Sequence, residues 1–70
     1  MIINYDSKND LLYIRFDKAS QPIINKRIDD TIVLDLGEND RIVGIEITDA
    51  SEHIQLNEIL PIEYAIRKAS

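Results

Sequence analysis

The sequence has no cysteine, no tryptophan and a single histidine, and only 6% of its 70 residues are aromatic. Disulfides are therefore excluded, and the usual tetrahedral zinc sites lack ligands within one chain. A chain of this size buries only about 60% of the surface that its unfolded form exposes, so small folds commonly depend on a disulfide, a metal or a partner subunit. We expect no cofactor, and self-association as a homodimer to supply the missing stability.

Long apolar runs are missing as well. None approaches the roughly 20 residues that span a bilayer, and Met1 to Ile3 lead directly into polar Asn4 instead of a signal peptide. Thirteen acidic and eight basic residues give a net charge of −5, which repels phosphate backbones and favours solubility or a basic protein partner. We expect a cytoplasmic protein that binds neither nucleic acid nor membranes.

What the sequence does contain is alternating apolar and polar residues. The alternation, which is typical of β-strands, runs through IINYD, LLYIRFD, IINKRIDD, TIVLDL and RIVGIEI. Short connections favour antiparallel pairing of neighbours, and the charged third run suits an edge strand. The prediction is an α+β fold that is mainly β: a four- to five-stranded antiparallel meander over about residues 2–47, in a single domain of residues 1–70.

A helical segment is predicted over about residues 49–69. Asp49 and Glu52 have the spacing of a capping box, which predicts a turn or two of helix over 50–54. Farther on, Pro61 suits a first helical position, and an amphipathic helix follows it. The apolar stripe of this helix is the possible interaction surface: Ile62, Ala65, Ile66 and Ala69. So short a helix needs a surface to pack on, either its own sheet or another chain.

Gly44 interrupts the last predicted strand. A glycine within a strand costs stability unless a bulge bends the strand or another group approaches its backbone closely. A C-terminal segment that covers Gly44 would explain it, and the covering surface could belong to this chain or to a partner.

No group of residues carries a recognisable catalytic or metal-binding signature, so no catalytic, cofactor-binding or metal residue is assigned. His53 lacks a nucleophile motif around Ser7, Ser20, Ser51 or Ser70. The acid pairs Asp29 with Asp30 and Asp35 with Glu46 are interpreted as solvated strand residues.

Two further groups also have a simpler structural interpretation. Asp35, Glu38, Asn39 and Asp40 offer oxygen ligands for calcium without the spacing of a calcium loop, and a hairpin turn accounts for them. A basic patch with stacking aromatics could involve Lys26, Arg27, Arg15 and Arg41 with Tyr5 and Tyr13, but the negative net charge argues against it.

The segments YDSKNDLLYIRF, from Tyr5 to Phe16, and IDDTIVLDLGENDRIVGIEITDAS, from Ile28 to Ser51, resemble a small prokaryotic family, domain of unknown function 2283. The matching residues are Tyr5, Asp6, Asp10, Leu12, Tyr13, Ile14, Asp35, Leu36, Val43, Gly44, Ile45, Glu46, Ile47, Asp49, Ala50 and Ser51. The resemblance implies a small β-rich fold with no established activity or catalytic residue. Gly37 and Asp40 depart from the pattern, so Asn39 or Asp40 must supply any left-handed turn residue.

Three functions remain open at this point. The first is a non-catalytic module for protein interaction or self-association, acting through the sheet edge or the C-terminal stripe. The second, implied by the resemblance because some relatives look like partners of small toxin-like proteins, is an antitoxin-like partner of a small basic toxin. The third is a small hydrolase or metal-dependent enzyme centred on His53.

Overall fold

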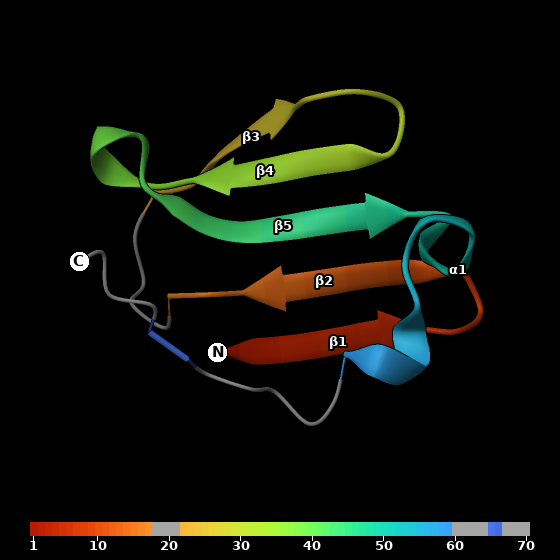
Figure 1. Ribbon diagram of the computed structural model, residues 1–70. Helices are drawn as coiled ribbons and strands as arrows, with labels where there is room; N and C mark the ends of the chain where they lie inside the picture. The colour runs from red at the N-terminus through yellow and green to blue at the C-terminus, as the bar shows by residue number, and fades with distance from the viewer. Residues whose placement is uncertain (18–21, 60–64, 67–70) are drawn as a thin grey trace.

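Five antiparallel strands form one sheet in the computed structural model, which describes residues 1–17, 22–59 and 65–66 (Figure 1). The strands are β1 (Ile2–Asp6), β2 (Leu11–Arg15), β3 (Ile24–Arg27), β4 (Ile32–Leu36) and β5 (Ile42–Thr48). The remaining elements are the short helix α1 (Ala50–His53) and two 3-10 turns, η1 (Glu38–Asp40) and η2 (Leu56–Glu58). The predicted fold class, mainly β with antiparallel strands, is confirmed.

The strand order is β1-β2-β5-β4-β3, which departs from the predicted meander at one connection. Sequence neighbours pair as expected from β1 to β2 and from β3 through β4 to β5, but β5 lies between β2 and β4. The order has a physical reason. The longest and most buried strand, β5, gains hydrogen-bonding partners on both sides, while all four residues of charged β3 are exposed at an edge.

The register gives the sheet two different faces. Because side chains alternate along a strand, residues in one cross-strand row share a face. Two such rows define the apolar face. The first contains Ile3, Ile14, Ile45, Leu34 and Lys26, and the second contains Tyr5, Leu12, Ile47 and Ile32. Ile24 and Ile28, on and just after β3, belong to the same face. The opposite face, which we call the polar face, carries Asn4, Tyr13, Arg15, Gly44, Glu46, Asp35, Asn25 and Arg27, together with the apolar residues Ile2, Leu11 and Val33.

The turns use acidic and amide residues where the backbone is left-handed. Asn39 and Asp40 both have positive φ, 56° and 58°, as the departure from the family pattern predicted. Asp6 organises the β1–β2 turn, since its carboxylate accepts hydrogen bonds from the main-chain N–H groups of Lys8 and Asn9 and from the Asn9 side chain. The Asn9 side chain contributes most to lowering the pKa of Asp6.

Helix α1 forms where it was predicted, but its predicted cap is wrong. Asp49 adopts a left-handed conformation with φ of 50°, and its side chain makes no capping hydrogen bond. A capping side chain normally belongs to a residue in the extended region, which is the reason for the failure. Asp10 caps the helix instead: its carbonyl oxygen accepts from Ala50 N and its Oδ1 from Ser51 N, both at 3.0 Å.

The predicted C-terminal helix over 61–69 falls largely outside the described residues. Of its members, Ala65 and Ile66 are described, and neither is helical. No helix within the described ranges is long and apolar enough to cross a membrane.

Exchanging the Asp10 carboxylate for an amide tests its capping role. Asp10→Asn keeps a residue that tolerates the left-handed backbone but removes the charge, so we expect the midpoint of urea unfolding to fall. Asp49→Asn is the matched control, because Asp49 has the same backbone conformation and no capping bond. Equal midpoints for the two variants would contradict the cap assigned to Asp10.

Candidate functional site

The apolar face is covered at one end. Helix α1 and turn η2 lie over that end of the sheet, near the finish of β1 and β5 (Figure 1). Turn η2 and Ile59 border a groove of about 330 Å³ above Ile3, Tyr5 and Leu12. A second groove, of about 230 Å³, lies where Ile54 and His53 approach Ile32 and Ile47. Among the described residues, only Leu12, Val43 and Ala50 are fully buried apolar side chains.

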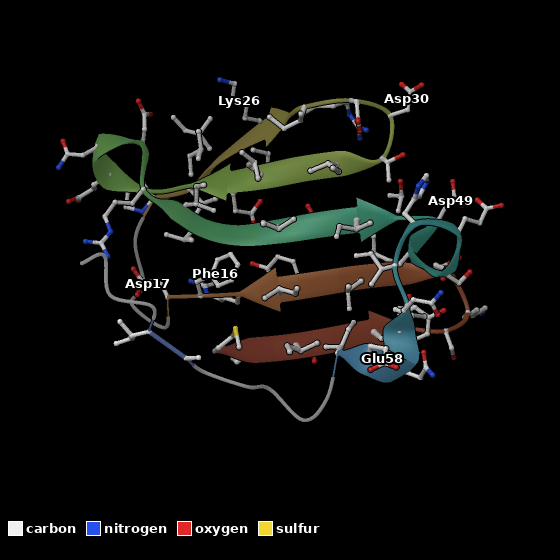
Figure 2. The ribbon with its side chains drawn as sticks, viewed as in Figure 1. Phe16, Asp17, Lys26, Asp30, Asp49 and Glu58 are labelled. Carbon is white, nitrogen blue, oxygen red and sulfur yellow. The ribbon has the colours of Figure 1, made fainter. Side chains whose placement is uncertain are left out.

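Several large apolar side chains of this face are exposed beyond α1 and η2, although Val43, two residues before Ile45 on β5, is fully buried. Phe16, just beyond β2, is about half exposed, and Figure 2 shows it at the end of the sheet opposite α1. On and just after the edge strand β3, Ile24 is 71% exposed and Ile28 51%. Between these positions Ile14, Ile45 and Leu34 are only partly buried. The open surface is thus continuous across β2, β5, β4 and β3, as an interaction site would be.

The predicted C-terminal stripe is only partly placed. Ile62 and Ala69 lie outside the described residues, while Ala65 and Ile66 are exposed, with Ile66 at 71%. The described part of the stripe is therefore not buried against the sheet. Its role in binding stays a prediction.

The polar face is closed by a contact that the sequence did not reveal. The Tyr13 hydroxyl on β2 donates to Asp35 Oδ2 on β4 at 2.9 Å, so the side chain reaches across β5. It passes over Gly44, where a methyl group would lie 2.8 Å from the hydroxyl oxygen and 3.2 Å from the ring. The suggestion that the C-terminal segment covers Gly44 is wrong, because Tyr13 already fills the space. A shift in the β4–β5 register also occurs beside Gly44.

The acceptor of this hydrogen bond, Asp35, is buried. Asp35 is only 7% exposed, and its Oδ1 is buried without a hydrogen-bond partner. Burial, followed by the hydrogen bond to Asp35, raises the pKa of Tyr13, so the phenol keeps its proton and remains the donor. The arrangement ties together three neighbouring strands, β2, β5 and β4.

A second hydrogen-bond network joins the β1–β2 hairpin to the start of α1. Asp10 accepts hydrogen bonds from the Tyr5 hydroxyl and the Ser51 hydroxyl, each at 2.6 Å. The Ser51 hydroxyl contributes most to lowering the pKa of Asp10, and the bond to Asp10 contributes most to raising the pKa of Tyr5. The network fixes the start of α1 against the β1–β2 hairpin, and Ala50 beside it is fully buried.

These contacts fall within the segment that a known family covers. Residues 2–51 match the family described as "Protein of unknown function (DUF2283)". The chain belongs to this family. The match ends at Ser51, so it includes all three members of the Tyr5, Asp10 and Ser51 network as well as Tyr13, Gly44 and Asp35. No curated protein and no solved structure matches the chain. The family pattern was the signal that could have singled out both networks.

The structure does not bring Ser51 and His53, two candidate catalytic residues that it describes, together as a nucleophile and its base. Ser51 donates to Asp10 and not to His53, while Ser20 and Ser70 lie outside the described residues. His53 is exposed beside Asp29, whose Oδ1 accepts the N–H groups of Thr31 and Ile32. Those two N–H groups are the main reason that the pKa of Asp29 is lowered.

Asp35 and Glu46 lie on the same face in neighbouring rows, and the interpretation of Asp35 as a solvated strand residue is wrong, because its side chain is buried. Asp35 faces Gly44 across the sheet, and Glu46 faces Val33. Glu38, Asn39 and Asp40 are exposed in η1, whereas Asp35 is buried. Within the part of the chain that the structure describes, no three acidic or histidine side chains are grouped to hold a metal ion.

The suggested nucleic-acid patch is divided between the two faces. Tyr5 lies on the apolar face and Tyr13 on the polar face, so the two rings cannot form one stacking surface. Lys26 and Arg27 are likewise neighbours on β3 that point to opposite sides.

Adding a methyl group at Gly44 tests the closed polar face. Gly44→Ala should displace the Tyr13 side chain or strain the strand, which costs about 1–3 kcal/mol in the free energy of unfolding. Gly37→Ala is the control, since Gly37 has a φ of −97° that alanine adopts readily. Urea unfolding measures both, and an equally small effect of the two changes would contradict the packing of Tyr13 over Gly44.

Acid should weaken the fold through the turn carboxylates. The pKa values of Asp6, Asp10 and Asp29 are lowered below the usual 3.8, so their contribution to stability is complete above that value. It is lost as the pH falls through the lowered values. We expect urea midpoints to decline below about pH 4, and less steeply in Asp10→Asn than in wild type. Parallel curves for the two proteins would show that Asp10 has no part in the decline.

Proposed function

We propose that the protein is a non-catalytic interaction module that uses its apolar sheet face to bind another protein surface. The observation that carries the proposal is the open apolar face, with Ile24 71% exposed and Phe16 and Ile28 about half exposed. Contiguous apolar surface of this kind is rare on monomers and commonly marks an interaction site. We place the action in the cytoplasm, because small domains of oxidising compartments usually contain disulfides and this chain has no cysteine.

The chemistry of the polar face supports the same proposal. Its buried carboxylate, Asp35, is engaged by Tyr13, and the Asp10 carboxylate holds the start of α1. Both carboxylates therefore have a structural role within the fold, which accounts for them without a substrate. The apolar face has no comparable explanation within the described residues.

A matched pair of substitutions on β3 tests the proposal. Ile24→Glu places a charge on the apolar face, whereas Asn25→Glu places the same charge next to it on the polar face. Both positions are exposed, so neither change should unfold the chain. The readout is the apparent size of each tagged full-length variant in native cell extract at natural abundance.

We expect wild type and Asn25→Glu to elute as assemblies larger than one chain, and Ile24→Glu to shift toward the size of one chain. Elution of wild type as a single chain would contradict the proposal. So would an equal shift of the two variants.

A further inference from the structure

We propose that the surface covering the apolar face is the apolar face of a second copy of this chain, packed with its strands running in the opposite direction. The inference rests on the proposed function and names the partner. It makes the isolated sheet one half of a two-layered β-sandwich, in which two inner faces supply a shared core.

The composition of the face favours an identical partner. In the two cross-strand rows, the charged side chain is Lys26, on the edge strand β3. Figure 2 shows Lys26 extending outward beyond β3, which leaves its ammonium group in water when the face is covered. The acids among the described residues lie in or beside the turns, in α1 and η2 and on the polar face, so two copies can meet without bringing these carboxylates together despite the net charge of −5.

The area approaches that of a dimer interface. Burying the exposed parts of Tyr5, Phe16, Ile24 and Ile28 removes roughly 420 Å² per copy if each side chain offers about 200 Å², and the partly exposed aliphatic residues between them add to this area. A standard interface buries about 800 Å² per partner. The described part of the chain's own tail does not compete for this area, because Ala65 and Ile66 are exposed.

The shape of the face selects the relative direction of the two copies. Helix α1 and turn η2 lie over one end of the face (Figure 1), whereas Phe16 at the opposite end is about half exposed (Figure 2). If the strands of both copies ran the same way, the covered ends would meet and hold the opposite ends apart. With the strands reversed, the covered end of each copy lies over the opposite end of its partner.

This geometry makes a specific prediction for β3. A two-fold axis perpendicular to the strands places β3 over β3 of the second copy with its direction reversed. Ile24 at one end then approaches Ile28 of the partner subunit, and the same contact recurs by symmetry. The same register sets Lys26 against Lys26 of the partner subunit, so both ammonium groups must extend outward into water. These two residues are the most exposed of the large apolar side chains on the face.

Cross-linking of cysteine variants tests the arrangement in the full-length chain, which has no native cysteine. Purified Ile24→Cys and Ile28→Cys are mixed and treated with a short bismaleimide. The control mixture contains Asn25→Cys and Arg27→Cys, which lie on the polar face of the same strand. Sedimentation equilibrium of untreated wild type, Ile24→Glu and Asn25→Glu measures the association itself.

We expect wild type to have twice the mass of one chain, and the dissociation constant to rise at least tenfold in Ile24→Glu and less than twofold in Asn25→Glu. The Ile24 and Ile28 mixture should give a cross-linked dimer and the control mixture much less. A monomeric purified wild type that still forms a larger assembly in cell extract would overturn the second copy as partner but leave the proposed function intact. Equal cross-linking in the two mixtures would indicate edge-to-edge pairing and would overturn the face-to-face arrangement.

Discussion

The apolar face of a single-layered sheet must be removed from water, and this constraint explains most of the chain. Two cross-strand rows of aliphatic residues give the five strands a common inner side. Within the described residues, α1 and η2 cover one end of that side. Since apolar burial is the main favourable term in folding, a 70-residue chain with three fully buried apolar side chains among its described residues has little margin alone.

Polar contacts hold the remaining parts in place. Tyr13 crosses over Gly44 to reach Asp35, which closes the side of the sheet opposite the apolar face. Asp10 receives hydroxyl groups from Tyr5 and Ser51 and caps α1. Both networks position covering elements without forming a reactive pair. Asp10 and Asp35 are thus engaged in contacts within the fold, while Oδ1 of Asp35 is buried without a hydrogen-bond partner.

The strands could be predicted because apolar alternation reports which side chains share a face. Their order could not, since the alternation does not say which strand needs two neighbours, and β5 was therefore not recognised as lying between β2 and β4. The cap failed for a similar reason: the spacing of Asp49 and Glu52 suggested a local cap, whereas Asp10, about 40 residues earlier, makes the contact. Gly44 was correctly identified as a point of close approach, but Tyr13 is two strands away from its partner Asp35 and no local pattern links them.

The sequence predicted that the chain needs an interaction surface, but it did not predict where the open apolar face lies. The chain's need for an additional apolar surface followed from its size and its lack of cysteine, and the open apolar face agrees with that need. Its predicted location was the sheet edge or the stripe of Ile62, Ala65, Ile66 and Ala69, and the role of that stripe stays a prediction. The side of the sheet was not considered, because a helical period is easier to recognise in a sequence than the uncovered side of a sheet. Exposure depends on which elements fold back over the strands, and strand periodicity alone does not contain that information.

Isotope-filtered nuclear Overhauser spectroscopy on a mixture of labelled and unlabelled chains is the most direct test of the face-to-face dimer, because it detects contacts only between different copies. We predict contacts between the methyl groups of Ile24 in one copy and Ile28 of the partner subunit, with further contacts from Ile45 near the middle of the face. A spectrum without contacts between copies, from a sample in which these methyl groups remain accessible to a soluble paramagnetic probe, would contradict the account.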